Sequence, residues 1–145
     1  MTGFRSRDLR HVCSDATCYL DLLPWWDDIV DCFDSPNKPR HQRIRPTDVD
    51  GMVEINGRFL FLEEKGAGVP IPAGQGLAYR RLANLGEGLV TVKFLRPVHR
   101  VRSSNQIPDP VEVLSYPNAE GWQAMPRAEM LAQLRGWAAD ARGAT

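Results

Sequence analysis

The sequence has little of several features that define whole classes of protein. Its three cysteines, Cys13, Cys18 and Cys32, are odd in number and lack a C-x-x-C pair, so we expect reduced thiols and no disulfide framework. No apolar run reaches the roughly 18 residues that a membrane-spanning helix needs. The first residues, MTGFRSRDLRH, also lack the apolar stretch of a secretory signal. We therefore expect a cytoplasmic protein with no membrane partner.

The formal net charge is zero, but the charges are unevenly distributed along the chain. Residues 1–34 carry three Arg against seven Asp, residues 35–105 carry twelve Lys or Arg against six acids, and residues 106–145 carry three against five. The middle segment is basic, as binding to a phosphate backbone requires. A solvated charged face explains the same pattern, so both interpretations stay open.

The length and composition are those of one soluble domain. The chain has 145 residues, of which 43% are hydrophobic and 25% charged. A chain of this size can bury a core but has no room for two catalytic domains. We predict a single domain over residues 1–145, with a core of about 24–95 and a C-terminal extension over 96–145.

The most informative segment is a predicted β-hairpin. Two β-rich runs, DVDGMVEI (48–55) and RFLFLEEK (58–65), are separated by the dipeptide Asn56-Gly57, the strongest short-range signal for a type I′ turn. This two-residue turn fixes the register, so that Ile55 faces Arg58 and each pair further out follows.

The other predicted elements follow from apolar periodicity and from Pro or Gly at their ends. Before the hairpin we expect a helix over 24–33 and a short strand over 41–45. After it we expect a helix over 75–85 ended by Gly86 at the C′ position, a buried strand over 89–95, a loop over 96–110, a strand over 111–116 and a helix over 126–142 opening with Pro126. This order predicts a mixed α/β fold.

The hairpin register gathers charged residues on one face of the sheet. Asp50 faces Glu63 and Asp48 faces Lys65, whereas Glu64 points to the other face. Two opposed carboxylates repel unless a cation lies between them, and Mg²⁺ binds through one or two carboxylates while keeping water ligands. Lys65 can then orient an attacking water. The structural alternative is a salt-bridged cluster at a strand end.

An Asp, a hairpin and then E-x-K resemble the core of the PD-(D/E)xK nuclease superfamily. Here Asp50 is followed thirteen residues later by Glu63-Glu64-Lys65, and the order predicted for residues 24–95 matches the superfamily's α-β-β-β-α-β core. Gln75 and Tyr79 fit the Q-x-x-x-Y motif of RecB-type members, and their segment also resembles the Gln-bearing helix of the virus-type replication-repair nucleases, as found in phages.

The resemblance implies a restriction-endonuclease-like fold, a mixed central sheet flanked by helices, here with an added C-terminal helix. It implies that Asp50 and Glu63 hold Mg²⁺ or Mn²⁺, that Lys65 assists the water, and that Gln75 and Tyr79 steady the site or the DNA strand. The first motif departs from Pro-Asp, since it is Thr47-Asp48-Val49-Asp50. Asp48 therefore competes with Asp50 as the first ligand.

The function that follows is a metal-dependent deoxyribonuclease of DNA recombination or repair, an exonuclease or a structure-selective, junction-type endonuclease. Single-stranded or branched DNA and a homodimer stay open, because the fold does not choose among them. The alternative is a catalytically inactive nuclease fold that binds nucleic acid or acts as an inhibitor. A third hypothesis is a small zinc module built from His11 and the three cysteines. The residues predicted to bind nucleic acid are Arg80, Arg81, Arg96 and Arg100, with His99 and Arg102 suited to phosphate contacts.

Overall fold

The computed structural model describes residue 32, residues 49–103, residues 105–118 and residues 120–143. The chain divides into two compact units, Met1–Asp48 and Val49–Thr145, and the second is the one described below. The predicted helix over 24–33 and strand over 41–45 lie outside the described residues, except that Cys32 is helical and exposed.

The predicted hairpin is confirmed. Strand β1 (Gly51–Ile55) pairs antiparallel with β2 (Arg58–Glu64), and Ile55 lies opposite Arg58 as the turn requires. Asn56 and Gly57 have φ values of 51° and 80°, and a type I′ turn needs positive φ at both of its central residues. Strand β1 begins at Gly51, three residues later than predicted, so Asp50 immediately precedes it.

Helix α2 (Ala73–Leu85) confirms the predicted helix but ends differently. We expected Gly86 at the C′ position, yet it is the C-cap residue with φ −71°. The positive φ values fall on Glu87 and Gly88 instead. Gly86 is needed for space, because a Cβ there would lie 2.5 Å from Cγ2 of Val90.

Strand β3 (Val90–Pro97) pairs parallel with β2, and α2 makes the connection between them. The parallel ladder extends beyond β2, since the Lys65 N–H donates a 2.8 Å hydrogen bond to the Leu95 carbonyl. Strands β2 and β3 therefore end on the same side of the sheet, which we call its carboxyl end. As predicted for so apolar a strand, β3 is internal, with neighbours on both sides.

The predicted C-terminal extension supplies two strands and a helix to the same unit. Strand β4 (Val111–Tyr116) has the predicted bounds and pairs antiparallel with β3. Helix α3 (Arg127–Ala141) has Pro126 as its N-cap. Sequence analysis missed the short strand β5 (Gln123–Met125), which pairs antiparallel with β4. Three residues are too few to show an alternating pattern.

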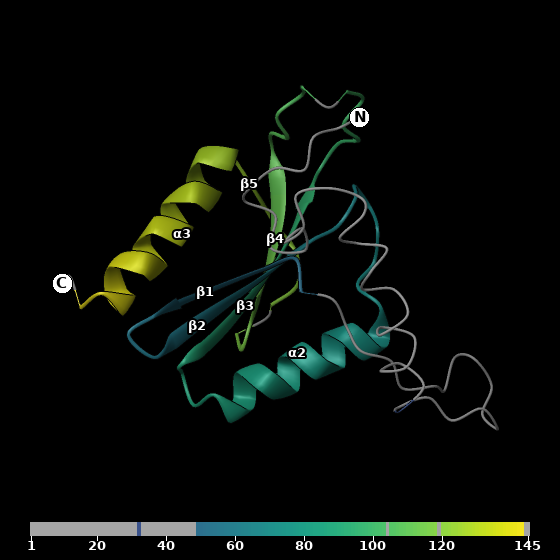
Figure 1. Cartoon of the computed structure of the whole chain (residues 1–145). Coiled ribbons are helices and arrows are strands. Elements are labelled where there is room, and N and C mark those ends of the chain that lie inside the picture. Colours follow the sequence, from purple (N-terminus) through teal and green to yellow (C-terminus); the bar gives the residue numbers. More distant parts are fainter. Residues whose placement is uncertain (1–31, 33–48, 104, 119, 144–145) are drawn as a thin grey trace, which may run out of the picture. The chain divides into compact units, whose positions relative to one another are not determined.

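The described residues form a five-stranded mixed sheet in the order β1-β2-β3-β4-β5, in which only β2 and β3 run parallel. Helices α2 and α3 cover opposite faces (Figure 1). Under α2 the core contains aromatic rings from both sheet and helix, with Tyr79 against Phe94 and Phe94 against Tyr116. Under α3 a smaller cluster joins Met130 to Val111, Val113 and Met125. The fold is thus mixed α/β, of the α+β kind.

In the part of the chain that the structure describes, no helix is both long enough and apolar enough to cross a membrane.

Candidate active site

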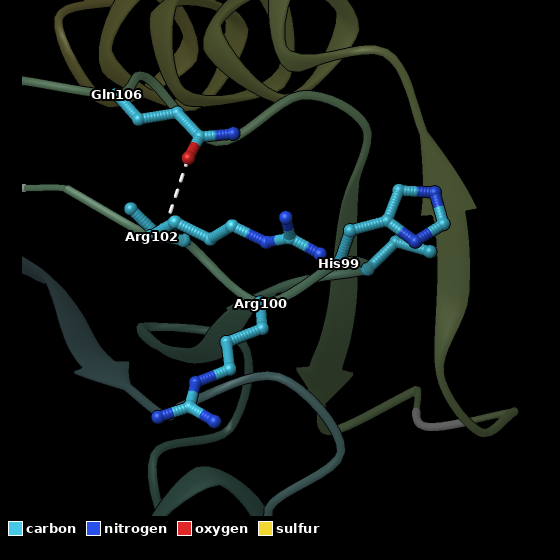
Figure 2. Close-up of a pocket in the computed structure, with 6 residues that line it drawn as sticks. His99, Arg100, Arg102 and Gln106 are labelled. Carbon is cyan, nitrogen blue, oxygen red and sulfur yellow. Dashed lines mark hydrogen bonds between the residues drawn. The ribbon is translucent and has the colours of Figure 1, made fainter.

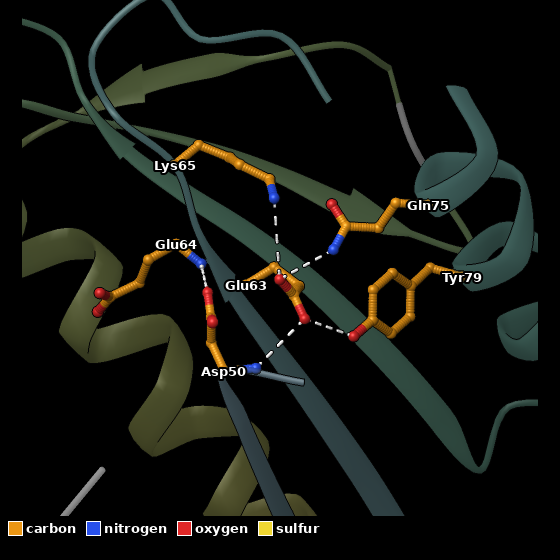
Figure 3. A network of polar contacts seen from close by, with 6 residues as sticks. All are labelled: Asp50, Glu63, Glu64, Lys65, Gln75 and Tyr79. Carbon is orange, nitrogen blue, oxygen red and sulfur yellow. Dashed lines mark hydrogen bonds and ion pairs between the residues drawn. The ribbon is translucent and has the colours of Figure 1, made fainter. Parts of the chain in front are cut away.

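The hairpin register places Asp50 beside Glu63 at the open end of the two strands. The Asp50 N–H donates a 3.3 Å hydrogen bond to Glu63 Oε1, and Asp50 Oδ2 accepts a 2.7 Å bond from the Glu64 N–H. Asp50 therefore contacts Glu63 across the open end of the hairpin through its backbone N–H, while its carboxylate accepts the Glu64 N–H (Figure 3). Asp48, the competing first ligand, lies outside the described residues.

Glu63 is the centre of the polar network. Its side chain is 2% exposed, and it is the buried acid among the described core residues. Oε1 accepts a 2.6 Å hydrogen bond from the Tyr79 hydroxyl, and Oε2 accepts a 3.1 Å bond from Gln75 Nε2. A buried carboxylate is costly unless its oxygens are hydrogen-bonded, and these two donors supply that need.

Helix α2 brings Gln75 and Tyr79 to the site from a separate element. The two residues are one helical turn apart, so they share a face of the helix. That face looks onto Glu63 (Figure 3). Their predicted placement over the carboxylate pair is confirmed, whereas their roles stay predictions.

Lys65 is the cation of this cluster. Its Nζ lies 3.9 Å from Glu63 Oε2, at the outer limit of an ion pair, and its side chain is 16% exposed. Glu64 points to the opposite face and is exposed, as the alternation of β2 predicts. The three residues of E-x-K therefore separate into a buried carboxylate, an outward neighbour and a nearby amine.

Tyr79 is held in its neutral form. Burial raises the pKa of its hydroxyl most, followed by the hydrogen bond to Glu63 and the negative charges of Glu63 and Asp50. The ring packs against Phe61 and, edge to face, against Phe94. Tyr79 is consequently a fixed hydrogen-bond donor and not a proton acceptor at neutral pH.

One atom beside the network is left without a partner. Gln75 Oε1 is buried and accepts no hydrogen bond, although the nitrogen of the same amide is bonded to Glu63. Buried acceptors are nearly always satisfied, by protein or by ordered water. A water bound to a cation would supply the missing donor. The unpartnered oxygen therefore fits a site in which the carboxylates of Asp50 and Glu63 would hold a divalent metal, whose bound water would be a donor for Gln75 Oε1.

The described residues offer no larger set of metal ligands. Among them, no three His, Cys, Asp or Glu side chains cluster together. Of the residues in the zinc hypothesis, His11, Cys13 and Cys18 lie outside the described residues, so the hypothesis stays a prediction.

The four arginines predicted to bind nucleic acid have different surroundings. Arg80 and Arg81 are exposed on α2, and the Arg80 guanidinium lies 5.6 Å from the centroid of the Tyr116 ring. Arg100 is exposed in the loop after β3. Arg96 alone is engaged inside the protein.

The Arg96 guanidinium joins three parts of the chain. Nε bonds Glu112 Oε2 at 2.6 Å, Nη1 bonds the Val69 carbonyl at 2.8 Å, and Cζ lies 3.9 Å from the centroid of the Trp122 ring. Val69 belongs to the segment between Lys65 and α2, so Arg96 fixes the segment that links the two sides of the site. Sequence reasoning missed Glu112 and Trp122 as its partners, since no spacing in the sequence connects them.

Comparison with known proteins gave no relative. No family model matches the chain, and neither the curated proteins nor the solved structures include a significant match.

Proposed function

We propose that the chain is a Mg²⁺- or Mn²⁺-dependent deoxyribonuclease of the PD-(D/E)xK type. The observation that carries the proposal is the convergence of Asp50, Lys65, Gln75 and Tyr79 on the buried carboxylate of Glu63. These are the residues on which the sequence resemblance rests, and they come from a hairpin and a separate helix.

The hydrogen bonds around Glu63 support a cation-binding role. Its two close side-chain donors, Tyr79 and Gln75, are neutral, and the one cationic group, Lys65, is 3.9 Å away. Neutral donors fix the direction of a carboxylate but leave its negative charge available. Glu63 and Asp50 together are then a pair of oriented anionic ligands, to which hard divalent cations bind well.

Each residue has one task in the proposed hydrolysis. A bound metal supplies an acidified water and neutralises charge on the phosphate oxygens. Asp50 and Glu63 hold the metal, while Tyr79 and Gln75 hold Glu63. Lys65, 3.9 Å from Glu63 Oε2, would orient the attacking water and offset the negative charge on the phosphate oxygens. The leaving oxygen takes its proton from solvent.

The proposed test compares wild type with Asp50→Asn on single-stranded, duplex, flap and four-way-junction DNA with Mg²⁺ or Mn²⁺. The Asn side-chain oxygen can still accept the Glu64 N–H bond, so this variant should fold while losing a metal ligand. We expect cleavage to be abolished and DNA binding to be kept.

The matched control is Glu64→Gln, which removes one negative charge from the adjacent residue on the opposite face. Cleavage by this variant should equal that of wild type. Equal cleavage by wild type and Asp50→Asn would refute the catalytic proposal and leave the inactive, nucleic-acid-binding alternative.

A further inference from the structure

A pocket of about 860 Å³ opens at the loop between β3 and β4 (Figure 2). Of its six described lining residues, three are basic and none is acidic. The six are Val98, His99, Arg100, Val101, Arg102 and Gln106. The volume is in the range of ligand pockets, roughly 300–1,000 Å³, so it can take a phosphate together with its sugar and base.

The loop is held in shape by hydrogen bonds of its own. Its base is closed by the Val98 N–H, which donates to the Pro110 carbonyl at 3.1 Å. Gln106 closes the tip, because its Oε1 accepts a 2.9 Å bond from the Arg102 N–H and its own N–H donates to the Ser103 carbonyl. Among the described residues of the loop, these bonds link Val98 to Pro110 at its base, and Arg102 and Ser103 to Gln106.

The acids nearest to this loop in sequence are occupied elsewhere. Glu112 is paired with Arg96, and Asp109 Oδ1 accepts a 3.0 Å bond from the Arg127 N–H at the start of α3. Within the described ranges, no carboxylate forms a salt bridge with Arg100 or Arg102. Their positive charges thus remain available to an anion.

The pocket and the Glu63 site are built on the same end of the sheet. Strands β2 and β3 are parallel neighbours, with Glu63 opposite Phe94 and Glu64 opposite Leu95. The chain continues from β2 into Lys65 and from β3 into the pocket loop, so both leave the sheet at its carboxyl end. Ligands of sheets with parallel strands characteristically bind at this end.

We propose that the pocket of the β3–β4 loop binds the sugar–phosphate backbone of a nucleic-acid strand, at a different phosphate from the one that the Glu63 site acts on. This inference rests on the proposed function and assigns part of its substrate path. Among the described residues of the lining there are guanidinium and imidazole groups but no Phe, Tyr or Trp on which a base could stack. Contacts of this kind hold the backbone without reading its sequence.

The test measures binding apart from cleavage. Fluorescence anisotropy with a short oligodeoxythymidylate, in EDTA and over a range of salt concentrations, compares wild type with the double variant Arg100→Ala, Arg102→Ala. We expect affinity at low salt to fall on the order of ten-fold. The plot of log K against log salt falls with salt, and it should become less steep by about 0.7 for each phosphate of the single strand that the variant no longer neutralises.

The control is the double variant Arg58→Ala, Arg135→Ala, which removes the same charge from two exposed positions away from the carboxyl end. Its affinity and salt slope should match those of wild type. Inorganic phosphate, added at the same ionic strength as chloride, should compete only weakly, because a free anion binds at one point where a strand binds at several.

The results separate this inference from the proposed function. Weaker binding by the loop variant alone supports the inference, even if no substrate is cleaved and the nuclease proposal fails. Equal binding by the loop variant and wild type overturns the inference, even if DNA is cleaved and the nuclease proposal stands. Equally weakened binding by both double variants would show a general charge effect and would also overturn it.

Discussion

The phenolic oxygen of Tyr79 lies 2.6 Å from Glu63 Oε1, and this bond joins helix α2 to strand β2 at the candidate active site. The two side chains are 5% and 2% exposed, so water does not compete for the bond. Because the raised pKa of Tyr79 keeps it protonated, the tyrosine orients Glu63 without neutralising it. The carboxylate thus keeps both the direction and the charge that a cation site needs.

Replacing Tyr79 by Phe should separate the hydrogen bond from the packing of the ring. The Phe ring can keep its packing against Phe61 and Phe94, whereas Glu63 Oε1 loses its shortest donor. We expect the free energy of unfolding to fall by about 1.5–3 kcal/mol, as for other hydrogen bonds to charged groups. Metal affinity, measured by titration calorimetry with Mn²⁺, should weaken by roughly 10–100-fold. An unchanged metal affinity would show that Tyr79 has only a structural role.

The same tyrosine should make stability depend on pH in the alkaline range. In the folded protein its pKa lies above the ordinary value of about 10. Below pH ~10 both states keep the proton and the stabilisation is fully present. Above it the unfolded chain releases the proton first, so the free energy of unfolding falls by up to about 1.4 kcal/mol per pH unit.

The measurement is the stability difference between wild type and Tyr79→Phe by chemical denaturation from about pH 8 to about pH 11, on either side of the ordinary tyrosine pKa. Lys93, whose pKa is lowered by burial, titrates with the opposite effect on stability. It is present in both proteins, so its contribution cancels. The difference should narrow as the pH rises, and a constant difference would contradict the prediction.

Glu63→Gln should abolish cleavage and lower stability moderately. The new side-chain NH₂ would meet the Gln75 NH₂, but a flip of the Gln75 amide would turn its unpartnered Oε1 toward residue 63. The flip restores a bond between residues 63 and 75 but leaves the Gln75 NH₂ at the buried position where Oε1 has no partner, so we expect the free energy of unfolding to fall by about 1–3 kcal/mol. Thermal and urea unfolding would test the change in stability, and the panel of DNA substrates would test the loss of cleavage. A stable variant that still cleaves DNA would remove Glu63 from the chemistry.

Gly86→Ala should destabilise the protein through crowding. The added Cβ would lie 2.5 Å and 2.6 Å from two side-chain carbons of Val90, which is part of the core under α2. We expect a loss of about 1–3 kcal/mol, typical of overpacking. Gly136→Ala, inside α3 with nothing within 4 Å of its Cβ position, is the matched control and should gain about 0.5–1 kcal/mol. The measurement is urea denaturation of both variants. Equal changes in their free energies of unfolding would contradict this account.

Arg96→Lys should loosen the segment between Lys65 and α2. Lysine keeps the charge but cannot bond Glu112 and the Val69 carbonyl together while stacking on Trp122. We expect stability to fall by about 1–2 kcal/mol and hydrogen exchange to accelerate in residues 66–72. Unchanged exchange in residues 66–72 would contradict this account.

The sequence by itself determined the hairpin and what the hairpin carries. Asn56-Gly57 sets the turn, the turn sets the register, and the register puts Asp50 against Glu63, with Lys65 beyond them. Each of these steps is local and depends on residues close in the chain, so it can be derived without the tertiary structure. The existence of α2, β3, β4 and α3 followed similarly from apolar patterns, with bounds within two residues of those observed.

Only the tertiary structure decided which distant groups meet. The bond from Tyr79 to Glu63, the crowding of Gly86 against Val90 and the stacking of Arg96 on Trp122 all depend on how helices and strands pack. Strand β5 likewise exists through its pairing with β4. These arrangements are fixed by close packing of side chains over the whole unit, and the sequence pattern of a single element does not contain that information.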